Sequence, residues 1–439
     1  MRNFFLIPVL FFFAVSFLFA EDEPFGFEED TEEVSKKIFT VNIGGKFYAG
    51  TSFYFNDFQN IKNVSLDLPF WGNIYLDATS PLTETYLNFK LNGKTLPIDL
   101  GSKPEFFVKP LLPLWIDQAY MQLLAGPVVL GGGIKKITWG RADFMSVLDI
   151  VNPLDYTCVS ELSIEKIKIA EPMFYMSAYL PKEMKIDFVF LPVFEGHRLA
   201  KDKRFNNFDF SIRHDKLKPI KTNTLQYFQG GFRYTSLIDE IHDIGFQYFY
   251  GFLPLPAIKE DGEIFDLKYD RSHQIGFDYG VQLGGAANLK TEIAANITGD
   301  VKGKNPYSYN PNIAWSLGAG YSFPYNITLG IYASQTIRLF QSGDKKDLLS
   351  SGIEKKLSPT DTRLQFSFSQ KLLRGSLDLK INVMGGIEDR DVFISSEINW
   401  ILASILLDLQ VGIYAGNSNG KLGRRFKNNF IKFSIGYEF

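Results

Sequence analysis

Apolar and polar residues alternate with a period of two along much of the chain, most clearly at its end. In residues 428–439 one set of alternate positions is apolar and the other is polar or small; the apolar set is Ile431, Phe433, Ile435, Tyr437 and Phe439. Successive side chains of a strand point to opposite faces, so this segment has one apolar and one polar face. A wall with lipid outside and water inside requires that arrangement, whereas a soluble chain gains nothing from it.

The same alternation recurs from Phe39 onward, in runs about long enough to cross a membrane as tilted strands. Clear examples are residues 39–53, 275–283, 313–321, 364–368, 377–383 and 405–413. The pattern therefore predicts an all-β fold built from transmembrane strands. A large soluble β-sandwich or propeller is the competing interpretation, because period-two alternation also occurs there.

The spacing of turn signals predicts the topology. Tight turns are expected near residues 80–82, 126–127, 181–183, 239–243, 284–287, 324, 373–374 and 403. Longer polar stretches lie between them, near 93–113, 141–166, 197–223, 257–271, 299–311, 340–360 and 415–427, while the outer connections near 57–63 and 388–391 are short. Outer-membrane barrels have short periplasmic turns and long extracellular loops, so we expect a transmembrane antiparallel up-and-down β-barrel of about eighteen strands, or else about sixteen, with both termini periplasmic.

The first 37 residues are predicted to lie outside the barrel. A short basic start is followed by an apolar run over 4–17 and small residues up to Ala20, which is typical of an export signal cleaved near Ala20. The apolar run is too short for a spanning helix. Residues 21–37 carry a dense acidic run and are predicted to be solvated and disordered, which leaves residues 38–439 for the barrel.

Composition narrows the class further. The apolar fraction is 45%, yet no run of about twenty apolar residues follows the signal, so helical membrane spans are excluded. Aromatic residues make up 15% of the chain, which suits the aromatic girdles of a membrane barrel. The single cysteine, Cys158, excludes an internal disulfide framework and a cysteine-based zinc site. A net charge of −3 gives no sign of nucleic-acid binding, and we expect no cofactor or metal.

One stretch carries a family resemblance. Residues 117–157 contain an Ala-Tyr pair, a Gly-rich strand that ends in Trp-Gly at 139–140, and a loop motif of Asp149, Asn152, Pro153 and Asp155. This resembles a porin-like outer-membrane β-barrel group loosely related to alginate-export and capsule-binding barrels. The resemblance implies a channel in the bacterial outer membrane, surrounded by lipid. It also implies insertion by the barrel-assembly machinery through the C-terminal strand, which ends in Phe439.

The loop that holds this motif is a candidate constriction. Asp, Asn and Pro at this spacing favour tight turns through bonds from side chain to backbone. A charged loop that folds into a wide pore is the usual basis of its selectivity. The candidate constriction residues are Arg141, Asp143, Asp149, Asn152 and Asp155. The alternative is that these residues only satisfy the backbone of their own loop, and the sequence leaves both interpretations open.

Charged residues also recur at the polar positions of the predicted strands. Unpaired charges in a dry core would be very costly, so their regular placement indicates a water-filled interior. The candidates for this inner face are Lys46, Arg233, Lys290, Glu292, Arg338, Asp378 and Lys380. In the alternative interpretation they pair across strands and stabilise the wall.

The function predicted from these features is a channel for passive or weakly selective passage of small polar solutes. A fatty-acid type transporter is one alternative, although residues 21–37 are too short and polar for its N-terminal plug; a surface-exposed adhesin or structural barrel is the other. We expect no enzymatic activity: His214 beside Asp215 is the one arrangement like a catalytic dyad, and no partner converges on it. The sequence leaves the solute and the oligomeric state open.

Overall fold

The computed structural model describes residues 39–55, 64–68, 70–93, 98–100, 114–156, 160–199, 217–218, 220–261, 264–305, 308–339 and 358–439. The predicted signal and acidic segment, Cys158 and His214 lie outside the described residues.

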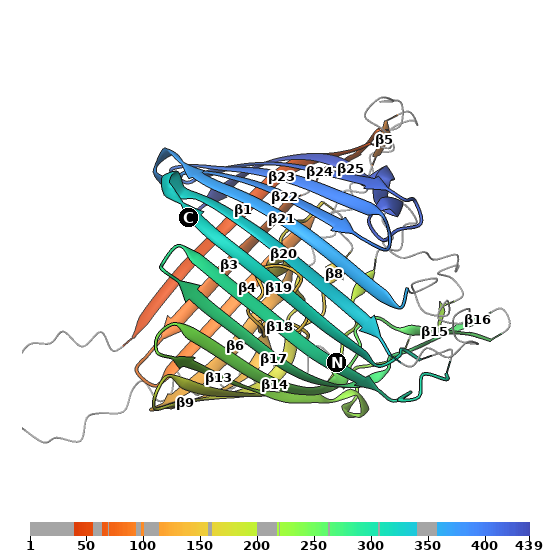
Figure 1. The fold of residues 1–439 in the computed structure, drawn as a ribbon. Coiled ribbons are helices and arrows are strands. Elements are labelled where there is room, and N and C mark those ends of the chain that lie inside the picture. The colour runs from red at the N-terminus through yellow and green to blue at the C-terminus, as the bar shows by residue number, and fades with distance from the viewer. Residues whose placement is uncertain are drawn as a thin grey trace, which may run out of the picture.

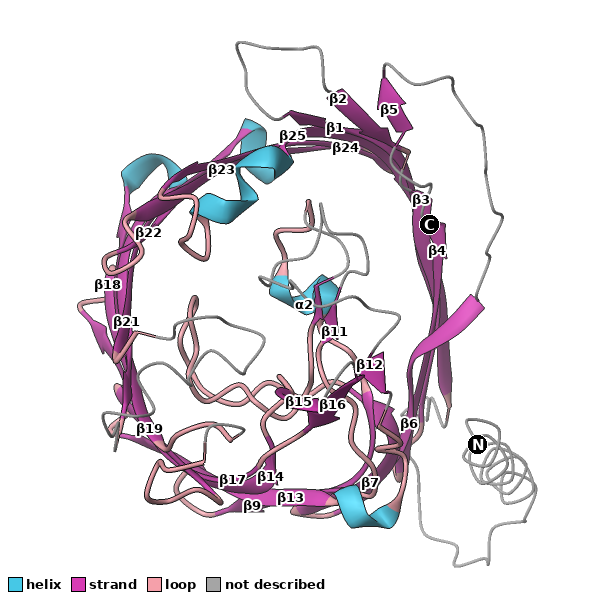
Figure 2. Cartoon of the chain, turned by 90° about the vertical axis from the view of Figure 1, so that its right-hand side faces the viewer, coloured by secondary structure: helices cyan, strands magenta, loops and turns pink. Residues whose placement is uncertain are grey.

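Within the described residues, eighteen antiparallel strands form one closed barrel (Figures 1 and 2). Its first nine strands are β1 (Thr40–Phe55), β3 (Phe70–Thr79), β4 (Thr83–Gly93), β6 (Leu114–Ala125), β7 (Val128–Lys135), β9 (Glu171–Leu180), β10 (Met184–Leu191), β13 (Gln229–Ile238) and β14 (His242–Phe252). The remainder are β17 (Arg271–Leu283), β18 (Ala287–Thr298), β19 (Asn312–Phe323), β20 (Ile327–Arg338), β21 (Thr360–Leu372), β22 (Leu377–Gly386), β23 (Asp391–Leu402), β24 (Ile405–Gly416) and β25 (Asn429–Glu438). The all-β barrel of about eighteen strands predicted from the sequence is confirmed.

Shorter elements belong to the connections. The strands β2 (Val64–Asp67) and β5 (Ile98–Leu100) extend the barrel sheet beyond β1. The others are β8 (Asp155–Tyr156), α2 (Ile164–Ile167), β11 (Arg198–Leu199), β12 (Leu217–Lys218), η4 (Leu225–Tyr227), β15 (Ala257–Asp261), β16 (Ile264–Lys268), η5 (Pro324–Asn326), η8 (Leu373–Gly375) and η9 (Gly423–Asn428). No helix in the described part of the chain is long and apolar enough to cross a membrane.

The first and last strands close the barrel. β1 pairs with β25 in antiparallel register from Lys46 opposite Glu438 to Phe55 opposite Asn429. Gly45 and Phe439 exchange two backbone hydrogen bonds, each 3.1 Å from N to O. Closure leaves no free edge, so every strand finds backbone partners on both sides, as a lipid environment demands.

The apolar and polar positions that alternate in the sequence lie on the outer and inner faces of the barrel wall. On β25, Phe433 and Tyr437 are 46% and 53% exposed on the outer face, while the intervening Lys432 and Ser434 are only 3% and 2% exposed on the inner side. The outer surface is therefore apolar and the lining polar, which is the reverse of a soluble barrel.

Tight turns gather at one end of the barrel and long connections at the other (Figure 1). The turn after β17 contains Gly284 and Gly285, both with positive φ, which is the backbone that a tight hairpin between twisted strands favours. The predicted turns at 80–82, 126–127, 181–183 and 403 also join adjacent strands. The positions of turn residues along the sequence thus predicted these strand connections correctly.

Candidate functional site: a loop across the lumen

The connection from β7 to β9, residues 136–170 with 157–159 outside the described set, is called here the inner loop. Seen along the barrel axis, it and its short helix α2 lie within the ring of strands (Figure 2). It contacts two opposite parts of the wall.

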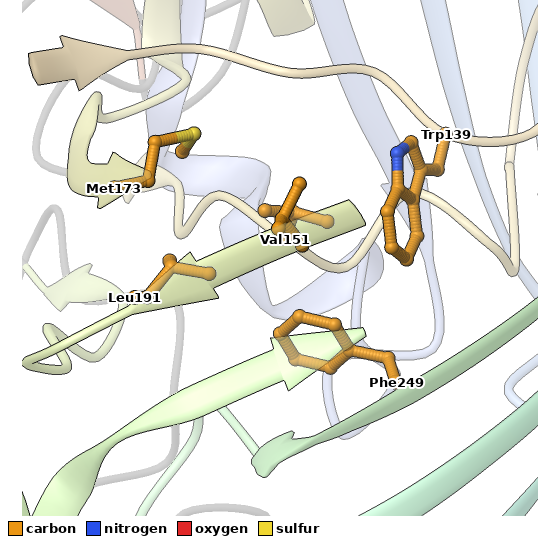
Figure 3. Close-up of a cluster of buried hydrophobic side chains, with 6 residues drawn as sticks. Trp139, Val151, Met173, Leu191 and Phe249 are labelled. Atoms are coloured by element: carbon orange, nitrogen blue, oxygen red, sulfur yellow. The ribbon is translucent and has the colours of Figure 1, made fainter. Parts of the chain in front are cut away.

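An apolar cluster fixes the base of the inner loop. Trp139 and Val151 from the loop pack with Met173 of β9, Leu191 of β10 and Phe249 of β14 (Figure 3). Trp139 is 2% exposed and meets the Phe249 ring edge to face, with centroids 6.0 Å apart. Burying each large apolar side chain contributes about 1.5–3 kcal/mol, so this cluster strongly favours the inward position of the loop.

Glu292 on β18 holds the middle of the loop. Its Oε1 accepts hydrogen bonds from the backbone N–H groups of Arg141 and Ala142, at 2.5 and 2.7 Å. Its Oε2 accepts from the Ser146 hydroxyl and the Val147 N–H, both at 2.8 Å, and more weakly from the Leu148 N–H. The side chain is 1% exposed, and a buried carboxylate is tolerable only when donors surround it in this way.

Two glutamines of the wall complete this attachment. Gln247 of β14 donates to the Leu148 carbonyl at 2.9 Å, and Gln274 of β17 donates to the Val147 carbonyl at 3.1 Å. Gly276 of β17 lies opposite Gln247, and a Cβ there would overlap the Leu148 side chain. The wall is therefore shaped to receive the loop backbone closely.

Arg141 is bound into the wall rather than free in the pore. Its guanidinium pairs with Asp278 of β17 and Asp243 of β14, and it donates to the Ile244 carbonyl at 3.2 Å. Asp278 is fully buried and also pairs with Arg233 at 2.8 Å. Two arginines thus surround one buried carboxylate, so Arg141 and Arg233 act together in fastening the loop.

Asp143 is the constriction candidate that faces water. Its carboxylate pairs with Lys290 of β18 at 2.5 Å, with side-chain exposures of 40% and 30%. Beside it, the Phe144 ring meets Tyr332 of β20 at 4.9 Å between centroids. At this end of the loop, one acid of the loop and one base of the wall are therefore exposed side by side.

The second half of the loop reaches the opposite wall. Ser160 accepts a hydrogen bond from the Tyr54 hydroxyl of β1 at 3.1 Å. Lys166 of α2 lies over the Trp71 ring of β3, with 5.1 Å from Nζ to the centroid, and its carbonyl accepts from Lys90 of β4 at 3.1 Å. The inner loop therefore crosses the lumen and is attached on both sides.

Two of the remaining candidates of the sequence motif, Asn152 and Asp149, hold the loop's own structure. Asn152 joins its two ends, accepting from the Ile137 N–H at 2.7 Å and donating to the carbonyls of Lys135 and Ile169. Asp149 pairs at 2.9 Å with Lys168, whose side chain is 1% exposed. Burial raises the pKa of Asp149, and the Lys168 charge opposes that effect. A constriction role for these residues stays a prediction.

Asp155 links the loop to a second connection. It lies in β8, which pairs in parallel with β11, and its carboxylate is 3.9 Å from Arg198. Next to this pair, His197 Nδ1 accepts a hydrogen bond from the Leu154 N–H at 2.8 Å. Burial lowers the pKa of His197 to about 4, so the ring is a neutral acceptor here.

The other lumen candidates lie along the wall. Lys46 pairs with Glu438 at 2.7 Å, Lys380 with Asp378 at 3.1 Å, and Arg338 donates to the Ser358 carbonyl at 2.5 Å. These contacts fit the alternative in which lumen charges stabilise the wall.

The sequence analysis does not identify four residues that hold the inner loop: Asp278, Gln247, Gln274 and Lys168. Asp278 and Gln274 stand at polar positions of their strand, but no sequence signal pairs them with a loop more than 120 residues away.

No protein-family model and no curated protein sequence matches the chain. Among solved structures, Pseudomonas aeruginosa OpdL is 10% identical, with 91% of this chain and 98% of that chain covered and a TM-score of 0.53. Pseudomonas aeruginosa OprD is 10% identical over 91% and 95% of the two chains with a TM-score of 0.50, and OccK11 (OpdR) is 10% identical over 91% and 96%, also with 0.50. These are porin-like outer-membrane barrels, and at this identity the likeness shows the fold alone. The relation to alginate-export and capsule-binding barrels remains a prediction from the motif.

Proposed function

We propose that this protein is a porin-like channel of the bacterial outer membrane for small polar solutes, with the inner loop as its constriction. The observation that carries the proposal is that this loop crosses the lumen of a closed barrel and is attached to both walls. A loop placed in this way leaves a narrowed, water-lined passage, which is how a wide barrel becomes a selective pore.

The location follows from the wall. Its outer face is apolar and its edge is closed, which suits lipid, and bacterial barrels of this kind reside in the outer membrane. The predicted export signal and the terminal Phe439 are consistent with that location and with insertion by the barrel-assembly machinery.

The lining favours a channel for polar solutes over a fatty-acid type transporter. A site for an apolar compound is lined mainly by apolar and aromatic side chains. Here the polar residues beneath the inner loop are buried, and the side chains left exposed on the inner face are charged: Lys46, Lys290 and Lys380 of the wall, at 38, 30 and 43%, and Asp143 of the loop, at 40%. An adhesin or structural barrel needs no passage, so conductance separates it from a channel.

The test is single-channel conductance of residues 21–439, folded and inserted in a planar bilayer, with ion selectivity from the reversal potential under a salt gradient. We expect discrete steps and weak selectivity, because Asp143 and Lys290 present both signs at the loop tip. In Asp143→Asn the uncompensated Lys290 shifts selectivity toward anions. The control Asp378→Asn removes a lumen carboxylate that pairs with Lys380 instead, and leaves selectivity nearer to that of the parent. A folded barrel that never conducts would overturn the proposal.

A further inference from the structure

Four tyrosines form a continuous row on the inner wall, near the base of the inner loop. They are Tyr75 of β3, Tyr86 of β4, Tyr120 of β6 and Tyr175 of β9, here called the tyrosine row. Successive ring centroids are 6.3, 5.5 and 6.5 Å apart. Their strand neighbours Ile74 and Phe174 are exposed on the lipid face, so the tyrosines themselves face the lumen.

Glycines of neighbouring strands lie beneath two of the rings. A Cβ at Gly44 would overlap the Tyr75 hydroxyl, and a Cβ at Gly131 would overlap the Tyr175 ring. Tyr75 and Tyr175 therefore each pack on a glycine of a neighbouring strand. Tyr120 and Tyr175 meet edge to face, with 77° between their planes, and Lys135 lies over both of these rings. Packing on glycine explains the position of Tyr75, but it does not explain why two rings that no described cation covers, Tyr75 and Tyr86, adjoin in a polar lumen.

Groups that hydrogen-bond border the row. Gln122 accepts from the Tyr175 hydroxyl at 2.9 Å and donates to Glu84 at 2.7 Å. On the same strands as Tyr75 and Tyr86, Asn73 Nδ2 donates to Asn88 Oδ1 at 3.4 Å. Amide and carboxylate groups on an aromatic surface supply both donors and acceptors at its edge.

The charges around the row balance. Asp117 pairs with Lys136 at 2.8 Å. The Lys135 ammonium lies 4.1 and 4.2 Å from the centroids of Tyr120 and Tyr175, so a cation already occupies the position where a cationic ligand would bind. The described acids near the row include Asp77, Glu84, Asp117 and Asp187, and the described bases include Lys90, Lys135, Lys136 and Lys185. An anionic ligand finds no excess of positive charge.

We propose that the tyrosine row is a binding path for uncharged carbohydrates, which deepens the proposed function and rests on it. A sugar ring has an apolar C–H face and an edge of hydroxyls that donate and accept. The face lies on a tyrosine ring, and the hydroxyls meet the bordering amides and carboxylates. Neighbouring rings let the sugar move along the row in small steps, so that binding is weak and repeated.

The experiment measures the reduction of ionic current through single channels as maltotriose is added to the bilayer chamber. We expect a saturable reduction in the parent protein. In Tyr86→Leu the dissociation constant rises roughly three- to tenfold, the value of one aromatic stacking contact, whereas Tyr86→Phe keeps the ring and the affinity. Phe174→Leu is the matched control, because Phe174 is the strand neighbour of Tyr175 but is 57% exposed on the lipid face, outside the lumen.

Three outcomes would overturn the carbohydrate path and leave the channel intact: a conducting barrel that maltotriose does not affect, an equal effect in Tyr86→Leu and the parent, or a reduction by choline but not by maltotriose. Calorimetric titration of the folded protein in detergent with maltotriose measures binding without conduction, and so separates failure of the carbohydrate path from failure of the channel proposal. A barrel that binds maltotriose through Tyr86 but never conducts retains the path and refutes the channel.

Discussion

At the residue scale, Glu292 carries the attachment of the inner loop. A carboxylate offers two oxygens with four lone-pair sites, and five donors of the loop use them. Its neighbours on the wall, Gln247 and Gln274, point donors at the loop carbonyls, so acceptor and donors of the wall match those of the loop. If an amide replaces the carboxylate, one of its two acceptor oxygens becomes an NH₂ donor, which then faces the donors of the loop.

We therefore expect Glu292→Gln to loosen the loop. The new NH₂ group faces the N–H donors that Glu292 accepted, and loss of charge-assisted bonds costs about 1.5–3 kcal/mol each. Single-channel recordings should show larger mean conductance and more open-state noise than the parent. Asp378→Asn, a comparable carboxylate-to-amide change elsewhere in the lumen, should record like the parent; equal noise in both variants would argue against this role of Glu292.

What the sequence could predict at this scale was the type of residue, not its partner. Lys290 and Glu292 were recognised as lumen residues because they stand at the polar phase of a strand. That Glu292 is buried under the loop follows from a contact spanning 151 residues, which no local pattern reports. The same holds for Arg141, whose charge was recognised but whose partners Asp243 and Asp278 lie on two other strands.

At the element scale, the short pair of β8 and β11 couples the inner loop to the next outer connection. His197 precedes β11 and accepts from the Leu154 N–H beside β8, with the Tyr156 ring against its own at 5.1 Å. Backbone bonds from His197 to Pro254 and from Arg198 to Leu154 complete the junction. No sequence pattern predicts this junction, since two-residue strands are too short to show a period.

This junction should weaken in acid. The pKa of His197 is lowered by burial to about 4, against about 6.5 when the ring is exposed, so docking favours the neutral form. Its contribution is complete above pH 6.5 and falls as the pH drops toward 4, by up to roughly 3 kcal/mol. We expect conductance fluctuations to increase over that pH range in the parent and to change less in His197→Gln, which keeps an acceptor without a titratable ring. Identical pH profiles in the two proteins would show that the effect does not come from His197.

At the scale of the whole molecule, the period-two pattern predicted the fold because the solvent imposes it. Every membrane-facing position must be apolar and every lumen position tolerates polarity, so strands such as β17 and β25 repeat one rule over their length. Turn residues then mark the ends of the strands, which is why the predicted number of strands is also correct. The path of the inner loop obeys no such rule, because it is determined by contacts with at least seven separate strands.

The division into a lipid face and a water face is itself testable with two adjacent residues. Ile381 and Asn382 lie in the middle of β22; Ile381 is 41% exposed on the outer face, and Asn382 stands on the inner face, opposite Ser367 and Ser395. Arginine on a lipid-facing site near the bilayer midplane costs roughly 2–4 kcal/mol, whereas a lumen site leaves the guanidinium in water. Urea unfolding in lipid vesicles should therefore show a large loss of stability for Ile381→Arg and a much smaller one for Asn382→Arg. If Asn382→Arg were the more damaging substitution, the interior would be a dry core, and both the channel and the carbohydrate path would lose the water-filled lumen on which they depend.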